Sequence, residues 1–119
     1  MILVDTSVWI DHLRKIDQHL QFLLVEGEVV GHDFVIGELV CGSLKNRKEI
    51  IGLLQALPHT PLINFDEYLF FIERHKLFDK GIGFIDIHLL ASAKLAQVKL
   101  WTFDKRLRST AIELGLNYR

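Results

Sequence analysis

The sequence has a single cysteine, Cys41, and only two prolines among its 119 residues. One cysteine cannot form an internal disulfide, which favours a reducing compartment such as the cytoplasm, and its apolar neighbours predict that Cys41 packs in the core. No apolar run approaches the roughly 20 residues of a membrane-spanning helix, and no basic region precedes a signal-like core at the N-terminus. We therefore expect a cytoplasmic protein with no membrane contact, formed by a single domain over residues 1–119.

A large excess of charge of either sign is also missing. The 14 basic and 15 acidic residues give a formal net charge of -1, which argues against a cationic nucleic-acid coat protein but leaves room for a local basic rim. Apolar residues, in contrast, make up 50% of the chain, and the mean hydropathy is +0.24. This surplus predicts an exposed apolar patch that a second copy or another protein covers.

Short apolar runs alternate with amphipathic stretches along the chain. Strands are expected at residues 2–4, 28–32, 61–63, 98–102 and 115–118. Helices are expected at about 7–15, 17–26, 33–41, 45–57, 66–80, 86–96 and 104–114. This alternation requires crossover connections and predicts an α/β fold, with three α/β/α layers and a central, mostly parallel sheet of about five strands.

Two of the apolar runs end in an acid with a similar format, Leu3-Val4-Asp5 and Trp101-Thr102-Phe103-Asp104. Parallel strands would bring both acids to one edge of the sheet, where open α/β folds bind ligands. Asp86 and Asp104 also stand at expected helix starts, so each alone is better explained as an N-cap. Asp5 is harder to explain in that way, because Thr6 or Ser7 can cap the helix that follows it.

Glu38 lies in the middle of a helical stretch that has almost no other polar residue. A glutamate among apolar neighbours is rarely buried unless a partner neutralises it. No lysine or arginine lies within four residues on either side, so a metal ion is the favoured partner.

Four carboxylates at one sheet edge would repel one another strongly in a partly dry cleft. Oxygen-only sites suit hard cations such as Mg²⁺ or Mn²⁺, and the chain has no Cys and His cluster at the spacing of a zinc site. The sequence therefore predicts that Asp5, Glu38, Asp86 and Asp104 meet around a hard divalent cation.

Four segments, in order, resemble those of the PIN-domain nucleases, and among them the VapC-type toxins of toxin–antitoxin pairs. They are Leu3–Ile10, Ile36–Gly42, Gly83–Ala93 and Leu100–Leu107. The resemblance implies a PIN-like fold and metal-dependent cleavage of RNA, with a VapB-like antitoxin and a homodimer as partners. It implies that the catalytic and metal-binding residues are Asp5, Glu38, Asp86 and Asp104, supported by the hydroxyls of Thr6 and Thr102.

Lys105 occupies a position where some PIN nucleases have a further acid, so the resemblance leaves one or two ions open. Basic residues near the expected site are candidates for RNA phosphate contacts, although for any single one of them a solvated helix surface is the favoured explanation. They are Lys105, Arg106 and Arg108 after the last strand, and Lys45, Arg47 and Lys48 between the third and fourth helices.

Aromatic and apolar residues have two competing interpretations. Trp9, Trp101 and Phe103 lie in apolar runs, so core packing is favoured over stacking on RNA bases. His88 follows Asp86 by two helical residues and is therefore expected on a different face, outside the site. The first two helices are candidates for an antitoxin groove through Trp9, Leu13, Leu20, Phe22 and Leu24.

Three other functions remain open. A housekeeping PIN nuclease in RNA maturation would have the same site and no antitoxin. A catalytically inactive module that binds RNA or protein would not need all four acids. A phosphatase with a phosphoaspartate intermediate usually has a second acid two residues after the nucleophile, where this chain has Ser7.

Overall fold

The computed structural model describes residues 1–119 as three strands and seven α-helices. The strands are β1 (Ile2–Val4), β2 (Val29–Val30) and β3 (Lys99–Trp101). The helices are α1 (Thr6–Arg14), α2 (Gln18–Val25), α3 (Asp33–Val40), α4 (Arg47–Ala56), α5 (Phe65–His75), α6 (Phe84–Ala96) and α7 (Lys105–Glu113). The predicted α/β class is confirmed. No helix is long and apolar enough to cross a membrane.

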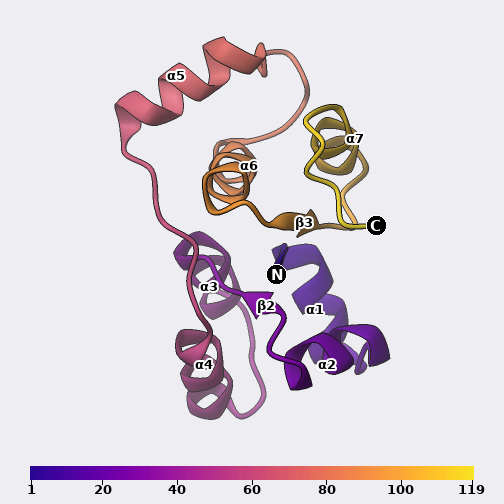
Figure 1. The fold of residues 1–119 in the computed structure, drawn as a ribbon. Helices are drawn as coiled ribbons and strands as arrows, with labels where there is room; N and C mark the ends of the chain where they lie inside the picture. Colours follow the sequence, from indigo (N-terminus) through magenta and orange to yellow (C-terminus); the bar gives the residue numbers. More distant parts are fainter.

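All three strands are parallel, in the order β2-β1-β3, so β1 is central. Helices α1 and α2 lie on one face of the sheet, and α3, α6 and α7 lie on the other, with α5 outside α6 (Figure 1). The crossover from β1 to β2 and the one from β2 to β3 run in opposite directions, which places their helices on opposite faces. This reversal leaves a crevice beyond the carboxyl ends of β1 and β3, the usual ligand position in open sheets.

The sheet is smaller than the five strands that the sequence predicts. The strand expected at residues 61–63 is absent, and β2 is extended instead by a single bridge between Gly31 and His59. Pro61, two residues later, has no N–H to donate to a ladder. The terminal strand expected at residues 115–118 is likewise reduced to one bridge, between Leu100 and Asn117.

The core is one cluster of 26 buried residues, to which β1, β3, the inner face of α6 and every other helix and strand contribute. Trp9 and Trp101 are buried, as predicted. The predictions of core packing for Cys41 and Phe103 are wrong, because the thiol of Cys41 is exposed and Phe103 is 47% exposed. Helix α3 buries the face that carries Leu39. Cys41 lies two positions after Leu39 and therefore points to another side of the helix.

Several helices begin at residues other than those predicted. Helix α6 begins at Phe84, so Asp86 is its third residue and not its cap. Helix α3 is capped by His32 rather than Asp33. Helix α5 follows a capping box at Asn64 and ends at His75, before the left-handed residue Lys76, and does not continue to residue 80 as predicted. Asp17 and Asp104 cap α2 and α7, as predicted.

His32 fixes α3 against α6 from a fully buried position. Its Nδ1 accepts a hydrogen bond from the backbone N–H of Phe34 (3.0 Å), and its Nε2 lies 3.1 Å from the hydroxyl of Ser92 on α6. Burial lowers the pKa of His32 to about 4, and the positive charges that His88 and His59 can carry act in the same direction, while Asp33 opposes them. The folded protein therefore keeps this imidazole neutral.

Stability is expected to fall as the pH is lowered from about 6.5 to 4. In that interval the unfolded chain takes up a proton at residue 32 that the folded protein does not, so the free energy of unfolding decreases by up to about 3 kcal/mol. Urea unfolding at pH 7, 5.5 and 4.5 measures this slope. His32→Asn retains a capping acceptor but no titrating group, and its slope should be flatter; an equal slope would contradict the assignment.

Candidate active site

Asp5 is the N-cap of α1, directly after the central strand, and it is buried. Its carboxylate does not cap the helix. Instead Oδ2 accepts hydrogen bonds from the hydroxyls of Ser7 (2.8 Å) and Thr102 (2.7 Å). The prediction that Thr6 or Ser7 caps α1 is therefore wrong, because the Ser7 hydroxyl is directed to Asp5 itself.

Glu38 approaches the site from α3 on the opposite face of the sheet. Its Oε1 accepts a hydrogen bond from the Thr6 hydroxyl at 2.7 Å, which ties α3 to the start of α1. The sequence-based expectation that Glu38 is buried is wrong, since its side chain is exposed. Glu38 lines an open pocket, so its negative charge is solvated by water and needs no buried positive partner.

Asp86 and Asp104 stand at the first turns of α6 and α7. Asp86 Oδ2 accepts from the backbone N–H of Gly83 (3.0 Å), and Asp104 Oδ1 accepts from that of Leu107 (2.9 Å). Thr102 joins Asp104 to the site as well, because its hydroxyl oxygen accepts from the Asp104 backbone N–H (3.0 Å).

The four carboxylates share one pattern of hydrogen bonding. Each has one oxygen held by the protein, whereas the other oxygen makes no hydrogen bond within the chain: Oδ1 of Asp5, Oε2 of Glu38, Oδ1 of Asp86 and Oδ2 of Asp104. None of the four forms an ion pair with a lysine or arginine. The site therefore presents four oriented carboxylates without a countercharge from the chain.

The four carboxylates influence one another electrostatically. Burial raises the pKa of Asp86, and the negative charges of Asp5, Asp104 and Glu38 raise it further, while the hydrogen bond from Gly83 lowers it. Like charges raise the pKa of a carboxyl because they disfavour its ionised form. A cation among the four would relieve this repulsion.

The donor set fits a hard divalent cation. It consists of carboxylate oxygens with hydroxyls around them, and it includes no thiolate or imidazole. The side chains do not stand close enough for three of them to form a ready-made coordination sphere. Asp5, Asp86, Asp104 and Glu38 are the residues whose free oxygens could hold Mg²⁺ or Mn²⁺ once their side chains come closer together.

Ser7 is a site residue that sequence reasoning did not identify. Besides its bond to Asp5, its oxygen accepts from the backbone N–H of Phe103 (3.0 Å) and lies 3.3 Å from the hydroxyl of Thr102. It thereby joins the ends of β1 and β3. Only its position two residues after Asp5 could have indicated this role, and that position was interpreted as a helix cap.

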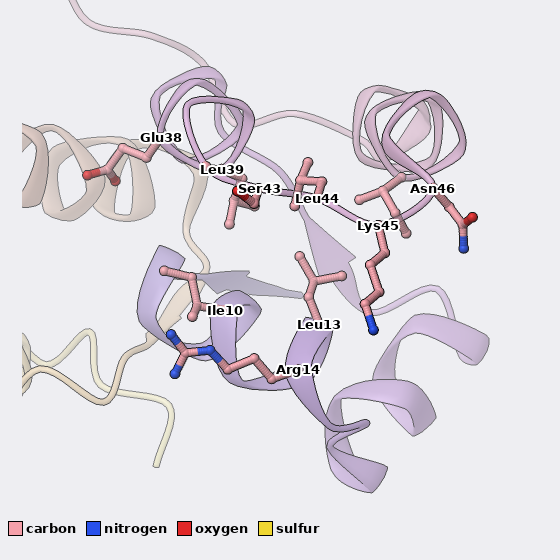
Figure 2. Close-up of a pocket in the computed structure, with 11 residues that line it drawn as sticks. Ile10, Leu13, Arg14, Glu38, Leu39, Ser43, Leu44, Lys45 and Asn46 are labelled. Atoms are coloured by element: carbon pink, nitrogen blue, oxygen red, sulfur yellow. The ribbon is translucent and has the colours of Figure 1, made fainter.

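A pocket of about 720 Å³ extends from Glu38 between α1, α3 and the start of α4. In Figure 2 Arg14 projects from α1 and Lys45 from the loop before α4, with Leu13 between them, and Leu44 lies beside Ser43; all of them line the pocket. Arg14 is a second residue that the sequence analysis missed. The pocket joins the carboxylate cleft to a cationic and apolar surface.

The other predicted phosphate contacts differ in whether their charged groups are free or already engaged within the protein. Arg47 donates to the carbonyls of Val40 (2.6 Å) and Gly42 (3.2 Å), so it caps the end of α3. Arg106 lies across Gly81, where φ is +72° and a Cβ would come within 2.7 Å of its Nη1. Lys105 is exposed next to Asp104.

His88 lies outside the site, as predicted. It is buried among the rings of Phe34, Tyr68 and Phe84, with centroid distances of 4.9, 4.8 and 4.5 Å, and neither ring nitrogen has a hydrogen-bond partner. Its packing supports α6, two residues after Asp86.

Comparison with known families identifies this arrangement. A family model described as the PIN domain matches residues 2–113. The chain belongs to the PIN-domain family. It is 44% identical over 117 residues to the protein named Ribonuclease VapC32 in two strains of Mycobacterium tuberculosis, CDC 1551 and H37Rv, with 98% of this chain and 94% of the relative covered. The predicted resemblance to VapC-type PIN nucleases is therefore confirmed.

The fold of this PIN domain is also similar to a solved structure. The crystal structure of PAE2754 from Pyrobaculum aerophilum superposes with a TM-score of 0.64, covering 96% of this chain and 88% of the other. At 16% sequence identity this similarity concerns the fold alone. It agrees with the PIN-like α/β architecture predicted from the sequence.

Proposed function

We propose that this PIN domain is a VapC-type endoribonuclease that acts on RNA in the cytoplasm with Mg²⁺ or Mn²⁺. The observation that carries the proposal is the set of four carboxylates at the crevice, each with one oxygen fixed by the protein and one left free. The likeness to Ribonuclease VapC32 over nearly the whole chain supports the same activity.

Each side chain has a distinct role in this proposal. When bound, the divalent cation would acidify a water molecule and offset the negative charge at the scissile phosphate. Ser7 and Thr102 hold the Asp5 carboxylate in one orientation, and the Gly83 N–H does the same for Asp86. Glu38, which is exposed, is positioned by Thr6 to accept a proton from water.

The RNA chain is expected to enter along the basic side of the cleft. Arg14 and Lys45 border the pocket that begins at Glu38, and Lys105 is exposed beside Asp104. Guanidinium and ammonium groups that have no acidic partner suit the phosphates that flank a cleavage position. Arg47 is less suited, because its guanidinium is engaged with two carbonyls.

Cleavage of a mixture of total tRNA and ribosomal RNA tests the proposal. Purified protein with Mg²⁺ or Mn²⁺ should give discrete fragments that carry 5′-phosphate and 3′-hydroxyl ends. Ligation that depends on a 5′-phosphate identifies these ends. Absence of cleavage by folded protein free of any bound inhibitor, with either metal, would instead favour a module that only binds RNA.

A second apolar pocket of about 390 Å³ lies between α1, α2 and α4 and suits an amphipathic antitoxin segment. Trp9, Leu13 and Leu24 line it, as expected, but Leu20 is fully buried and Phe22 lies outside it. Helix α4, which the sequence analysis did not include, supplies Ile50, Leu53, Leu54, Ala56 and Leu57. Loss of antitoxin co-purification in Leu53→Asp would test this contact.

We further propose that a second copy covers the apolar surface of α5. Phe65, Leu69 and Phe70 are exposed on this helix, by 62%, 45% and 69%. The first turn of α5 carries two acids and its last turn carries Arg74 and His75, so two antiparallel copies would pair opposite charges. Sedimentation should show a dimer that Phe70→Asp dissociates, and a monomeric parent protein would exclude this pairing.

A further inference from the structure

A pocket of about 550 Å³ lies beside the carboxylate cleft, on the side of α7 and the chain end. Its walls come from three separate parts of the chain: the start of α2, the residues that follow β3, and α7 with the last residue. They include His19, Trp101, Thr102, Phe103, Arg108 and Arg119. The volume is within the range of about 300–1,000 Å³ that is typical of small-molecule sites.

This pocket and the carboxylate cleft share a wall. Thr102 lines the pocket, and its hydroxyl donates to Asp5 Oδ2 at 2.7 Å. Phe103 also lines the pocket, and its backbone N–H donates to the Ser7 hydroxyl that holds the same carboxylate. Thr102 and the backbone of Phe103 therefore connect the pocket to Asp5.

The polar side of the pocket is cationic. Neither Arg108 nor Arg119 forms an ion pair with a carboxylate side chain. Arg108 donates only through Nε, to the Arg119 backbone oxygen at 3.1 Å, which orients its guanidinium and leaves both terminal amino groups without a partner. The one acid in the wall, Asp17, is engaged as the cap of α2. The Arg119 guanidinium lies over the Trp101 ring at 5.7 Å. Two guanidinium groups without an acidic side-chain partner in a concave site suit a phosphate group.

The apolar side of the pocket carries an exposed aromatic ring. Phe103 is 47% exposed and meets Trp101 edge to face at a centroid distance of 5.9 Å. Behind it, His19 stacks on Tyr118 at 5.8 Å and bonds its hydroxyl at 2.7 Å, which makes this wall rigid. Exposed aromatic rings beside cationic groups are a common platform for single-stranded bases.

We propose that this pocket binds the nucleotide next to the scissile phosphate, with its phosphate on Arg108 and Arg119 and its base on Phe103. The assignment rests on the proposed nuclease function and adds a subsite to it. Its ligand is a single-stranded ribonucleotide unit, recognised by charge and stacking and not by base-pairing edges.

Binding of mononucleotides without any divalent metal tests the subsite separately from cleavage. The folded protein in EDTA would be titrated with adenosine 5′-monophosphate, with ribose 5-phosphate and with adenosine, followed by amide chemical shifts. Shifts are expected at Trp101–Phe103 and around Arg108. Arg108→Gln should weaken the two phosphate ligands about tenfold, and Phe103→Ala should weaken the two ligands that contain a base by a similar factor.

Matched controls are available in the segment after α5, which does not line the pocket. Phe78→Ala removes a phenylalanine that is 54% exposed, and Lys76→Gln removes an exposed positive charge at the end of α5. Both should leave nucleotide binding unchanged, and Arg108→Lys should retain part of the phosphate affinity. Shifts absent from the pocket, or equal losses in the control variants, would overturn the subsite.

The two proposals fail in different ways. If the unaltered protein cleaves RNA and Phe103→Ala and Arg108→Gln leave the KM unchanged, the subsite is wrong and the nuclease function stands. If nucleotides bind in the pocket but the protein cleaves no RNA with either metal, the nuclease function fails while the binding site stands.

Discussion

Replacing Asp5 with Asn is expected to reduce RNA cleavage by about a hundredfold or more while the protein remains folded. The amide oxygen of Asn has the shape to accept the hydrogen bonds that Ser7 and Thr102 donate to Asp5, so the ends of β1 and β3 stay joined. What is lost is the negative charge at the centre of the carboxylate cleft. Initial rates on a cleaved RNA, with circular dichroism for the fold, measure both effects.

Asp86→Asn should reduce cleavage to a similar extent, because it also removes a negative charge from the site. Its fold should be retained, because the amide oxygen can still accept the hydrogen bond from Gly83. Asp11→Asn is the matched control, because Asp11 is an exposed acid of α1 that lies outside the cleft. Its rate should equal that of the parent protein. Cleavage at the parent rate by either cleft variant would remove that residue from the active site.

Removal of divalent metal is expected to abolish cleavage, and metal binding is expected to stabilise the fold. The four carboxylates have no countercharge from the chain, and burial together with the charges of the other three raises the pKa of Asp86. A cation that binds only the folded state adds about 2.7 kcal/mol at one hundred times its Kd. For a domain of this size that corresponds to an increase in Tm of roughly 10 °C.

Cleavage assays and thermal melts with Mg²⁺, Mn²⁺ or excess EDTA provide the measurement, with NaCl added to equal ionic strength as the control. The melting increase should disappear in Asp5→Asn, because the deepest carboxylate of the cleft is then neutral. Undiminished cleavage in excess EDTA would show that no divalent cation takes part.

The core of the fold was predictable because its signals are local. The apolar run before Asp5, the helix caps at Asp17 and Asp104, and the alternation of strands with helices all depend on neighbouring residues. The number of strands was not predictable in the same way. Residues 59 and 117 each pair with the sheet through a single bridge. Whether such an edge segment forms a full strand depends on its contacts with a neighbouring strand that is distant in sequence.

Glu38 was selected for a partly incorrect reason. Its apolar neighbours suggested burial beside a cation, whereas it is exposed at the rim and bonded to Thr6. The apolar side chains around it serve the packing of α3 on the sheet and against α1. Because a helix has several faces, apolar neighbours in sequence do not determine the environment of one side chain.

The sequence by itself determined the fold class and the placement of Asp5 at the end of a central strand, and it selected the four acids as candidates for the site. Only the tertiary structure decided that Ser7 joins β1 to β3, that α4 lines the groove of α1 and α2, and that Arg108, Arg119 and Phe103 line one pocket. The reason is physical. A strand end or a helix cap is formed by residues within one turn of each other, whereas the cleft and the pockets form between segments that approach only when the layers pack.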